Sequence, residues 1–191
     1  MAIVNVNEPL LSVVRMAGLN FGIILVDEIG VTADVSGDKD MVCRYQGALL
    51  LYAKRNQLPI YLIRNSVDHN EKPFDEVRTT HEGAWSGIVG ADTRTFSKRL
   101  TTKDETNAFA NPALGQAIQD DGVNAVVIAG QSVNACCAAT ARGAAALGLT
   151  IYTSGVILRG GLVETQELLA FPPPGDTIMG WPDGARLCPT V

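Results

Sequence analysis

One short stretch of the chain places a cysteine where it could act as a nucleophile. Residues 126–129 are typical of a buried strand, which ends at Gly130. The segment that follows contains Cys136 and continues into an Ala-rich run that predicts a helix. Cys136 is therefore expected at or near a helix N-terminus, where unpaired backbone N–H groups and the helix dipole stabilise a thiolate. Lowering the pKa of a thiol from its usual value of about 8.5 by about two units would ionise most of it at neutral pH.

Two other roles for Cys136 remain open at the level of the residues. Cysteine is among the most commonly buried residue types, so Cys136 could be a small hydrophobic residue of the core. It could also form a redox pair with Cys137, although adjacent cysteines form a disulfide only with strain and lack the CxxC spacing. The cysteines at positions 43, 136, 137 and 188 show no disulfide framework and favour reduced thiols in the cytoplasm.

A second candidate for chemistry is Asp27, which follows the apolar run over residues 21–26. That run has the length of a buried strand. In a doubly wound sheet, ligands bind at the carboxyl ends of the strands, so an acid at this position could contact a substrate. The alternative is an ordinary turn or capping residue.

The elements that position these residues alternate between strands and helices. Apolar residues at helical spacing predict a helix over 38–57, and a strand over 59–63 then completes a right-handed βαβ unit. Further strands are expected over 94–97, 124–129, 149–153 and 177–181, and further helices over 10–19, 111–121, 135–147 and 163–170. This order predicts an α/β fold, a three-layer α/β/α arrangement with a mostly parallel sheet of five or six strands.

The composition fits one domain over residues 1–191, with an N-terminal arm at 1–20 and an irregular, Pro- and Gly-rich arm at 172–191. Of the 191 residues 47% are hydrophobic, and the formal net charge is −5 without a basic block, which argues against a nucleic-acid partner. Apolar runs are too short to span a bilayer, and the N-terminus lacks a signal peptide. We therefore expect a cytoplasmic protein with no membrane partner.

Three motifs, in the right order, resemble those of the isochorismatase-like cysteine hydrolases. Gly130-Gln-Ser-Val-Asn-Ala-Cys136, followed by Ala139-Thr140-Ala141, is similar to the family signature Gly-x-x-[Thr/Val]-[Asp/Asn]-x-Cys-Val…Thr-Ala. Residues 24–27 resemble the first-strand motif Val-[Ile/Val]-Asp-x-Gln, and residues 103–109 resemble Lys-x-x-x-[Ser/Asn]-Ala-Phe. The resemblance covers roughly residues 21–153.

This resemblance implies a catalytic triad of Asp27, Lys103 and Cys136. Asp27 would be the general base and Cys136 the nucleophile. Lys103 would favour the ionised forms of both, because a nearby cation stabilises a thiolate and a carboxylate. Lys98 is the alternative cation, although a solvent-exposed lysine is the simpler explanation for it.

The resemblance also implies how a substrate would be held. The backbone N–H groups of Ser132 and Cys136 would bind an oxyanion, beside a cis peptide bond expected at Gln131-Ser132. Phe109, Asn107 and Gln131 would contact the substrate. The implied reaction is hydrolysis of an amide or ureido C–N bond of a small molecule through a thioester.

Some positions depart from the family pattern and leave an alternative open. Ile29 replaces a frequent Gln, and Ser154 stands where the family usually has an acid. The alternative is therefore a catalytically weakened homologue that acts as a binding or structural protein. His69 and His81 lack the Asp-x-His spacing of metal-binding relatives, so neither a metal nor another cofactor is expected. Since family members commonly assemble, the resemblance implies a homo-oligomer.

Overall fold

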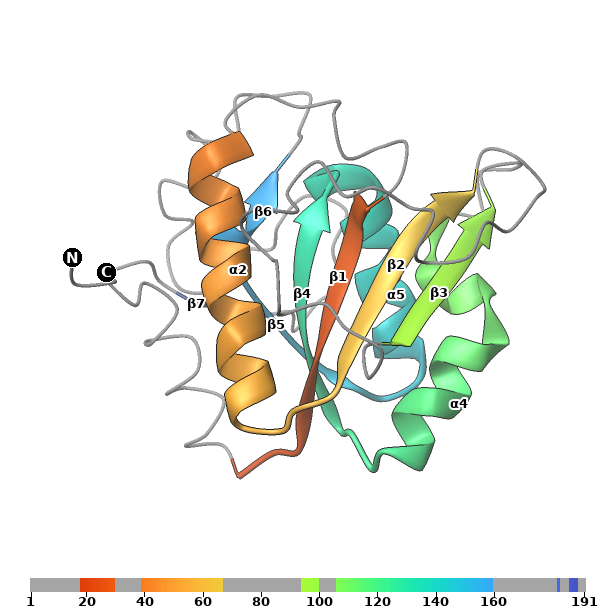
Figure 1. Cartoon of the computed structure of the whole chain (residues 1–191). Helices are drawn as coiled ribbons and strands as arrows, with labels where there is room; N and C mark the ends of the chain where they lie inside the picture. Colours follow the sequence, from red (N-terminus) through yellow and green to blue (C-terminus); the bar gives the residue numbers. More distant parts are fainter. Residues whose placement is uncertain are drawn as a thin grey trace.

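A parallel β-sheet forms the centre of the protein (Figure 1). The structure is a computed structural model, and it describes residues 18–29, 39–66, 94–99, 106–159, 182 and 186–188. Within these ranges seven strands form one sheet, and every strand pair is parallel. The strands are β1 (Phe21–Ile29), β2 (Ile60–Ser66), β3 (Arg94–Arg99), β4 (Ala125–Gln131), β5 (Thr150–Ser154), β6 (Leu158–Arg159) and β7 (Arg186–Cys188). Their order is β3-β2-β1-β4-β5-β7, and the two-residue strand β6 pairs with β4.

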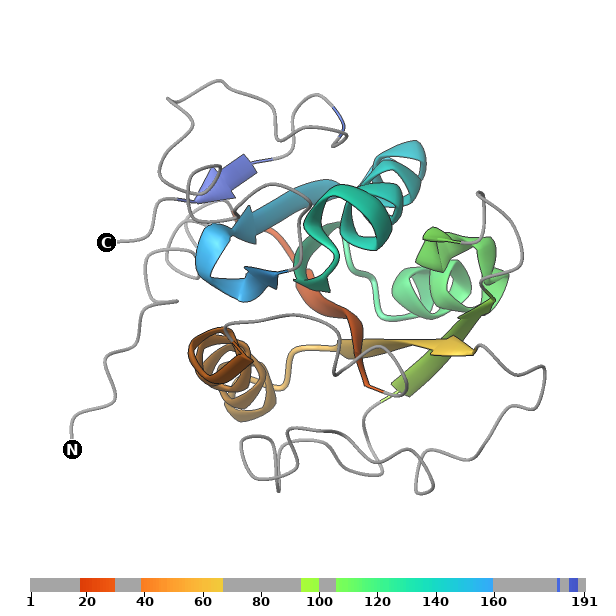
Figure 2. The ribbon, with the colours of Figure 1, turned by 90° about the horizontal axis from the view of Figure 1, so that it is seen from above.

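Helices cover both faces of the sheet. Helix α2 (Lys39–Arg55) lies on one face, and α4 (Pro112–Asp120) and α5 (Ala138–Ala146) lie on the other (Figures 1 and 2). Three shorter helical turns are η3 (Ala108–Ala110), η4 (Val133–Cys137) and η5 (Gly155–Ile157). The expected three-layer α/β/α fold is thus confirmed. In the described part of the chain, no helix is long and apolar enough to cross a membrane.

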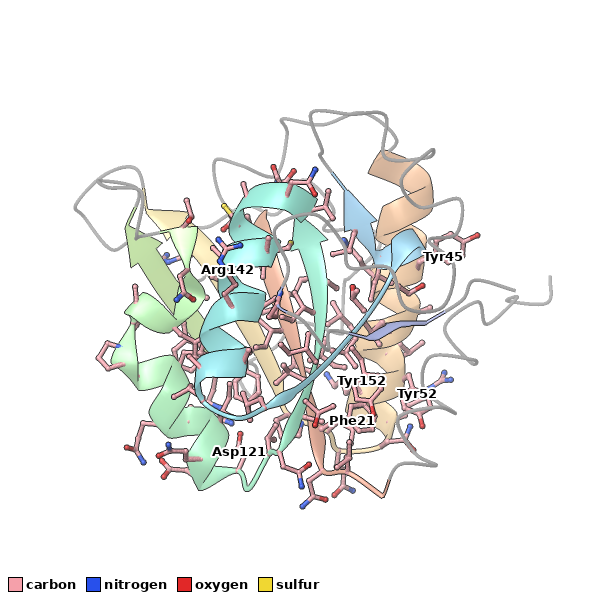
Figure 3. All side chains as sticks on the ribbon, turned by 180° about the vertical axis from the view of Figure 1, so that it is seen from behind. Phe21, Tyr45, Tyr52, Asp121, Arg142 and Tyr152 are labelled. Atoms are coloured by element: carbon pink, nitrogen blue, oxygen red, sulfur yellow. The ribbon has the colours of Figure 1, made fainter. Side chains whose placement is uncertain are left out.

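The side chains of β1 alternate between two apolar cores, one on each face of the sheet. Ile24 and Val26 are fully buried in the core that includes residues of α4 and α5. Ile23 and Leu25 are buried in the core on the α2 face. Four aromatic residues labelled in Figure 3 lie in or against this second core: Phe21, Tyr45, Tyr52 and Tyr152. A central strand buried on both faces accounts for the continuous apolar run seen in the sequence.

The order of the strands reverses at β1. Strands β2 and β3 lie on one side of β1, whereas β4 and β5 lie on the other. Val26 is the pairing partner of Ile63 in β2 and of Gly130 in β4. The carboxyl ends of β1 and β4 therefore flank a topological switch point, which is where open α/β sheets bind their ligands.

Most predicted elements within the described ranges lie where the sequence places them. The helix predicted over 111–121 is α4; the Oδ1 atom of its N-cap residue Asn111 accepts a hydrogen bond of 3.1 Å from the backbone N–H of Ala113. Gly122, beyond its C-terminus, has a left-handed φ of 64°. Within the arm expected to be irregular, Arg186–Cys188 pairs with β5 as strand β7. The elements predicted over 10–19, 163–170 and 177–181 lie wholly or mostly outside the described residues.

Two buried polar side chains connect neighbouring elements through backbone carbonyl groups. The Nε2 atom of Gln46 in α2 donates to the carbonyl oxygen of Ile157 in η5, at 3.0 Å. The hydroxyl of Thr153 in β5 donates to the carbonyl oxygen of Ile128 in β4, at 2.7 Å. Each bond satisfies a carbonyl group, which would be costly to leave unpaired in the interior.

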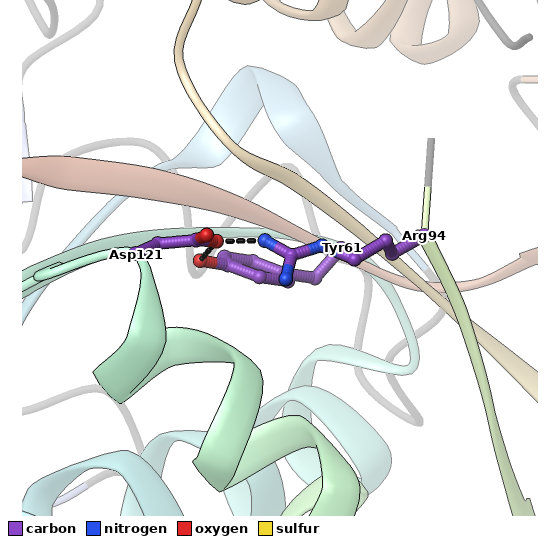
Figure 4. Close-up of polar contacts among 3 residues, drawn as sticks. All are labelled: Tyr61, Arg94 and Asp121. Atoms are coloured by element: carbon purple, nitrogen blue, oxygen red, sulfur yellow. Dashed lines mark hydrogen bonds and ion pairs between the residues drawn. The ribbon is translucent and has the colours of Figure 1, made fainter. Parts of the chain in front are cut away.

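Figure 4 shows a polar cluster of Tyr61, Arg94 and Asp121. The cluster lies where β2 and β3 begin, away from the switch point. Asp121, just after α4, accepts a hydrogen bond of 2.6 Å from the hydroxyl of Tyr61 and forms an ion pair with Arg94. The guanidinium of Arg94 also lies over the Tyr61 ring, 5.1 Å from its centroid. Burial raises the pKa of Tyr61 to about 12, and this effect outweighs the opposing influence of the Arg94 charge.

The Tyr61 cluster predicts a loss of stability in alkaline solution. Tyr61 ionises at a pKa of about 12 in the folded protein and at 10.0 in the unfolded chain, so the unfolded state loses its proton first. The contribution to the free energy of unfolding is complete below pH 10 and falls between pH 10 and 12, by about 1.4 kcal/mol at pH 11. Urea unfolding of wild type and Tyr61→Phe at pH 8 and pH 11 measures this difference. An equal fall in both proteins would contradict the assignment.

Candidate active site at the carboxyl ends of β1 and β4

The backbone of β1 lies close to Gly130 of β4. This residue has a φ of 121°, which side chains rarely permit. A methyl group at this position would lie 2.0 Å from the carbonyl oxygen of Val26. Because Val26 directly precedes Asp27, the contact brings the segment after β4 beside Asp27.

Asp27 lies at an irregularity of β1. Pairing with β2 is regular up to Val26 and resumes with a register shift at Ile29, while Asp27 itself has a left-handed φ of 56°. A regular strand would direct residue 27 to the α2 face, together with Ile23 and Leu25. The left-handed backbone interrupts this alternation, and the residue is only 2% exposed. The sequence predicted the place of Asp27 at the end of the paired apolar run, but it did not predict the left-handed turn.

Cys136 lies in the first turn of the helix that follows β4. The peptide bond Gln131-Ser132 is cis, as expected, and Ser132 is the N-cap residue of η4. Turn η4 is π-helical and continues directly into α5. It also contacts β1, and Cys136 is 9% exposed. Single π-helical turns are frequent at functional sites. The predicted position of Cys136 at a helix N-terminus is confirmed.

Two backbone hydrogen bonds hold η4, the turn that contains the predicted oxyanion donors. The backbone N–H groups of Ala135 and Cys137 both donate to the carbonyl oxygen of Ser132, at 3.1 Å. Neither bond uses the N–H of Ser132 or of Cys136, which are the two predicted oxyanion donors. The Ser132 side chain makes no capping hydrogen bond, unlike the usual serine at an N-cap.

Cys137 is placed as a core residue. It is fully buried, and its backbone is α-helical, with φ −66° and ψ −46°. Cys136 belongs to the same apolar core but is 9% exposed, and adjacent cysteines form a disulfide only with strain. No disulfide joins them. This geometry disfavours the redox pair.

Phe109 lies in η3, and Asn107 is the N-cap residue of this turn, which contacts α5. The Oδ1 atom of Asn107 accepts a hydrogen bond of 3.0 Å from the backbone N–H of Phe109 and so caps η3. The same oxygen lies against Gly143, where a methyl group would come within 2.4 Å of it. The hydroxyl of Thr140 accepts a hydrogen bond of 3.2 Å from the backbone N–H of Ala108. Asn107 therefore has a structural function here, whereas Phe109 packs partly buried against the core.

Gln131 was expected to contact substrate, and the structure gives its amide another contact. Its Nε2 atom donates to the backbone carbonyl oxygen of Asp27, at 2.7 Å. The residue is only 4% exposed. The resemblance does not predict this bond, which connects residues 104 positions apart in the chain.

The structure brings together four of the predicted site residues: Asp27, Gln131, Ser132 and Cys136. Lys103, His69 and His81 lie outside the described residues, and only the backbone of Lys98 is described, in β3. Sequence reasoning did not single out Asn134, although it is part of the quoted motif. Its Oδ1 atom is buried in η4, and none of the described residues donates a hydrogen bond to it.

Comparisons with solved structures identify proteins of the same fold. The nicotinamidase of Staphylococcus aureus is 15% identical, with a TM-score of 0.58, and the match covers 78% of this chain and 90% of that one. The pyrazinamidase of Pyrococcus horikoshii, solved in complex with zinc, is 22% identical, with a TM-score of 0.60 and coverage of 78% and 90%. A nicotinamidase/pyrazinamidase of Bacillus subtilis is 14% identical, with a TM-score of 0.62 and coverage of 78% and 91%.

Sequence comparison supports the same relationship at the level of the family. No curated protein matches the chain significantly. The family model described as the isochorismatase domain matches residues 29–154, which include Lys103 and Cys136. Since this match spans about two thirds of the sequence, and the fold agrees, the chain belongs to the isochorismatase domain family.

Proposed function

We propose that this protein is a cysteine hydrolase that cleaves the C–N bond of a small amide or ureido compound. Membership of the isochorismatase domain family supports a hydrolase. The structural relatives include a nicotinamidase and a pyrazinamidase, which supports an amide substrate. The observation that carries the proposal is the place of Cys136, in the first helical turn after β4; this turn contacts β1, the strand that carries the buried Asp27.

In the proposed reaction Asp27 takes the proton from the Sγ atom of Cys136. The thiolate then attacks the carbonyl carbon of the substrate, and the N–H groups of Ser132 and Cys136 bind the resulting oxyanion. Asp27 passes its proton to the leaving nitrogen as the C–N bond breaks, which leaves a thioester on Cys136. Water then attacks the thioester and gives a proton to Asp27. The C–S bond breaks, the acid product departs, and Asp27 returns the proton to the Cys136 thiolate.

Lys103 is the proposed cation of the triad, with Lys98 as the alternative. A positive charge beside Asp27 and Cys136 would stabilise both in their ionised forms. The matched family region includes Lys103, and the motif that it begins leads directly into η3, which contacts α5. The proposed reaction uses no metal ion, since His69 and His81 lack the Asp-x-His spacing of metal-binding relatives. The homo-oligomer and the cytoplasmic location remain predictions.

The pH dependence of alkylation tests this proposal. We expect iodoacetamide to modify Cys136 rapidly, with an apparent pKa below the usual value of about 8.5 for a thiol. Asp27→Asn and Lys103→Ala should each change that pKa, whereas Lys98→Ala should leave it unchanged. Mass spectrometry of the modified peptide measures the rate at Cys136 separately from the other cysteines. Slow modification that is indifferent to both triad substitutions would favour a binding or structural homologue.

A further inference from the structure

Gln131 makes a buried hydrogen bond to the backbone of the proposed general base. Its Nε2 atom lies 2.7 Å from the carbonyl oxygen of Asp27, and the two residues are 4% and 2% exposed. A buried amide hydrogen bond of this length is well formed. Its acceptor is the carbonyl group of Asp27, the one residue in β1 with a positive φ, 56°.

The direction of this carbonyl group is coupled to the backbone of Asp27. The carbonyl oxygen of a residue turns with its ψ angle, so a fixed hydrogen bond to the oxygen restricts ψ. A left-handed backbone at a residue other than glycine is uncommon and persists where the surroundings hold it. The register shift between Val26 and Ile29 removes the regular strand pairing that would otherwise fix this residue. Gln131 supplies a substitute contact from the neighbouring strand.

We infer that Gln131 is a positioning residue, which holds the left-handed turn at Asp27 and thereby fixes the placement of the Asp27 carboxyl group. This inference rests on the proposed function of Asp27 as the base. Gln131 is the last residue of β4 and directly precedes Ser132 and the Cys136 turn, so one segment carries both the nucleophile and the group that orients its base. Gly130, which precedes Gln131, keeps the two strands close enough for the bond.

Removal of the amide, with retention of its volume, tests the inference. In Gln131→Met the side chain keeps a similar length but cannot donate a hydrogen bond. Gln46→Met is the matched control, because Gln46 is also buried and also donates from Nε2 to a backbone carbonyl, that of Ile157. If Gln131→Met does not fold, Gln131→Glu provides a second variant that lacks the donor when it is ionised.

Two measurements separate positioning from a general loss of stability. Hydrogen exchange of the peptide that spans residues 21–29 should become about 10-fold faster in Gln131→Met than in Gln46→Met, because the turn at Asp27 opens locally. The pH profile of Cys136 alkylation should move toward that of Asp27→Asn, with a rate at pH 7 lower by about 10-fold, since small misplacements of reacting groups are costly. The Gln46→Met profile should match that of wild type.

The outcomes distinguish this inference from the proposed function. Unchanged hydrogen exchange of residues 21–29 in Gln131→Met would overturn the positioning role. An unchanged pH profile of Cys136 alkylation together with a higher KM for substrate would also overturn it, because that combination indicates a substrate contact. If wild-type alkylation is slow and indifferent to Asp27→Asn, the proposed function fails. Hydrogen exchange then decides by itself whether Gln131 holds the turn.

Discussion

Replacing Cys136 with alanine should abolish hydrolysis of the proposed amide substrate and lower kcat/KM by about 10,000-fold or more. The expected effect is large because the thioester step has no other route once the nucleophile is removed. The Cys136 side chain lies in the π-helical turn at the switch point of the sheet, next to the end of β1. Ammonia release from a panel of small amides measures the turnover, and mass spectrometry after acid quenching detects an acyl adduct on Cys136 of the wild type.

The adjacent cysteine provides the control for this prediction. Cys137 is fully buried among core residues, so Cys137→Ala should cost about 1 kcal/mol of stability and leave turnover nearly unchanged. Substantial hydrolysis by Cys136→Ala would contradict the thioester mechanism. Equal loss of activity in both variants would show that the helix as a whole, rather than the Cys136 thiol, had been disturbed.

Replacing Gly130 with alanine should produce the largest loss of stability, more than about 3 kcal/mol of the free energy of unfolding. The added methyl group would lie 2.0 Å from the Val26 carbonyl oxygen, and it meets backbone rather than a side chain that could move away. Relief of this contact requires β1 and β4 to separate. Because these two central strands carry Asp27 and Cys136, the same change should also slow alkylation of Cys136.

Gly122→Ala is the matched control for Gly130→Ala. Gly122 also has a positive φ, 64°, but nothing lies within 4 Å of a methyl group built there. This substitution should cost only the strain of a left-handed backbone, about 1 kcal/mol. Urea unfolding at neutral pH gives both values. Equal losses in the two variants would contradict a close approach of the strands at Gly130.

The arrangement of the site follows from the order of the strands. Sheet topology brings together two segments that are about 100 residues apart in the chain, at the ends of β1 and β4. The same end of the sheet then holds a buried carboxyl group, a thiol in a helical turn and the backbone N–H groups of that turn. Polar groups in a site from which water is largely excluded act more strongly than they do in solvent, which suits a reaction that develops charge.

Local chemistry determined much of the fold. The uninterrupted apolar run before Asp27 required a strand buried on both faces, and Asn111 with Pro112 required a helix start, because their preferences depend on near neighbours. The position of Cys136 after a strand and a glycine likewise specified a helix N-terminus. The motif resemblance added the cis peptide bond at Gln131-Ser132, which the structure contains.

Only the tertiary structure decided how the side chains at the site are used. The resemblance implied substrate contacts for Asn107 and Gln131, which stay predictions; the structure adds bonds from their amides to the backbone of Phe109 and Asp27. The left-handed turn at Asp27 and the contact of Asn107 with Gly143 are equally absent from any local pattern. These features depend on which segments meet across the sheet, and a hydrogen-bonding side chain takes whichever partner that packing places within about 3 Å. A single sequence shows which side chains can form hydrogen bonds, but it does not show which groups they bond to.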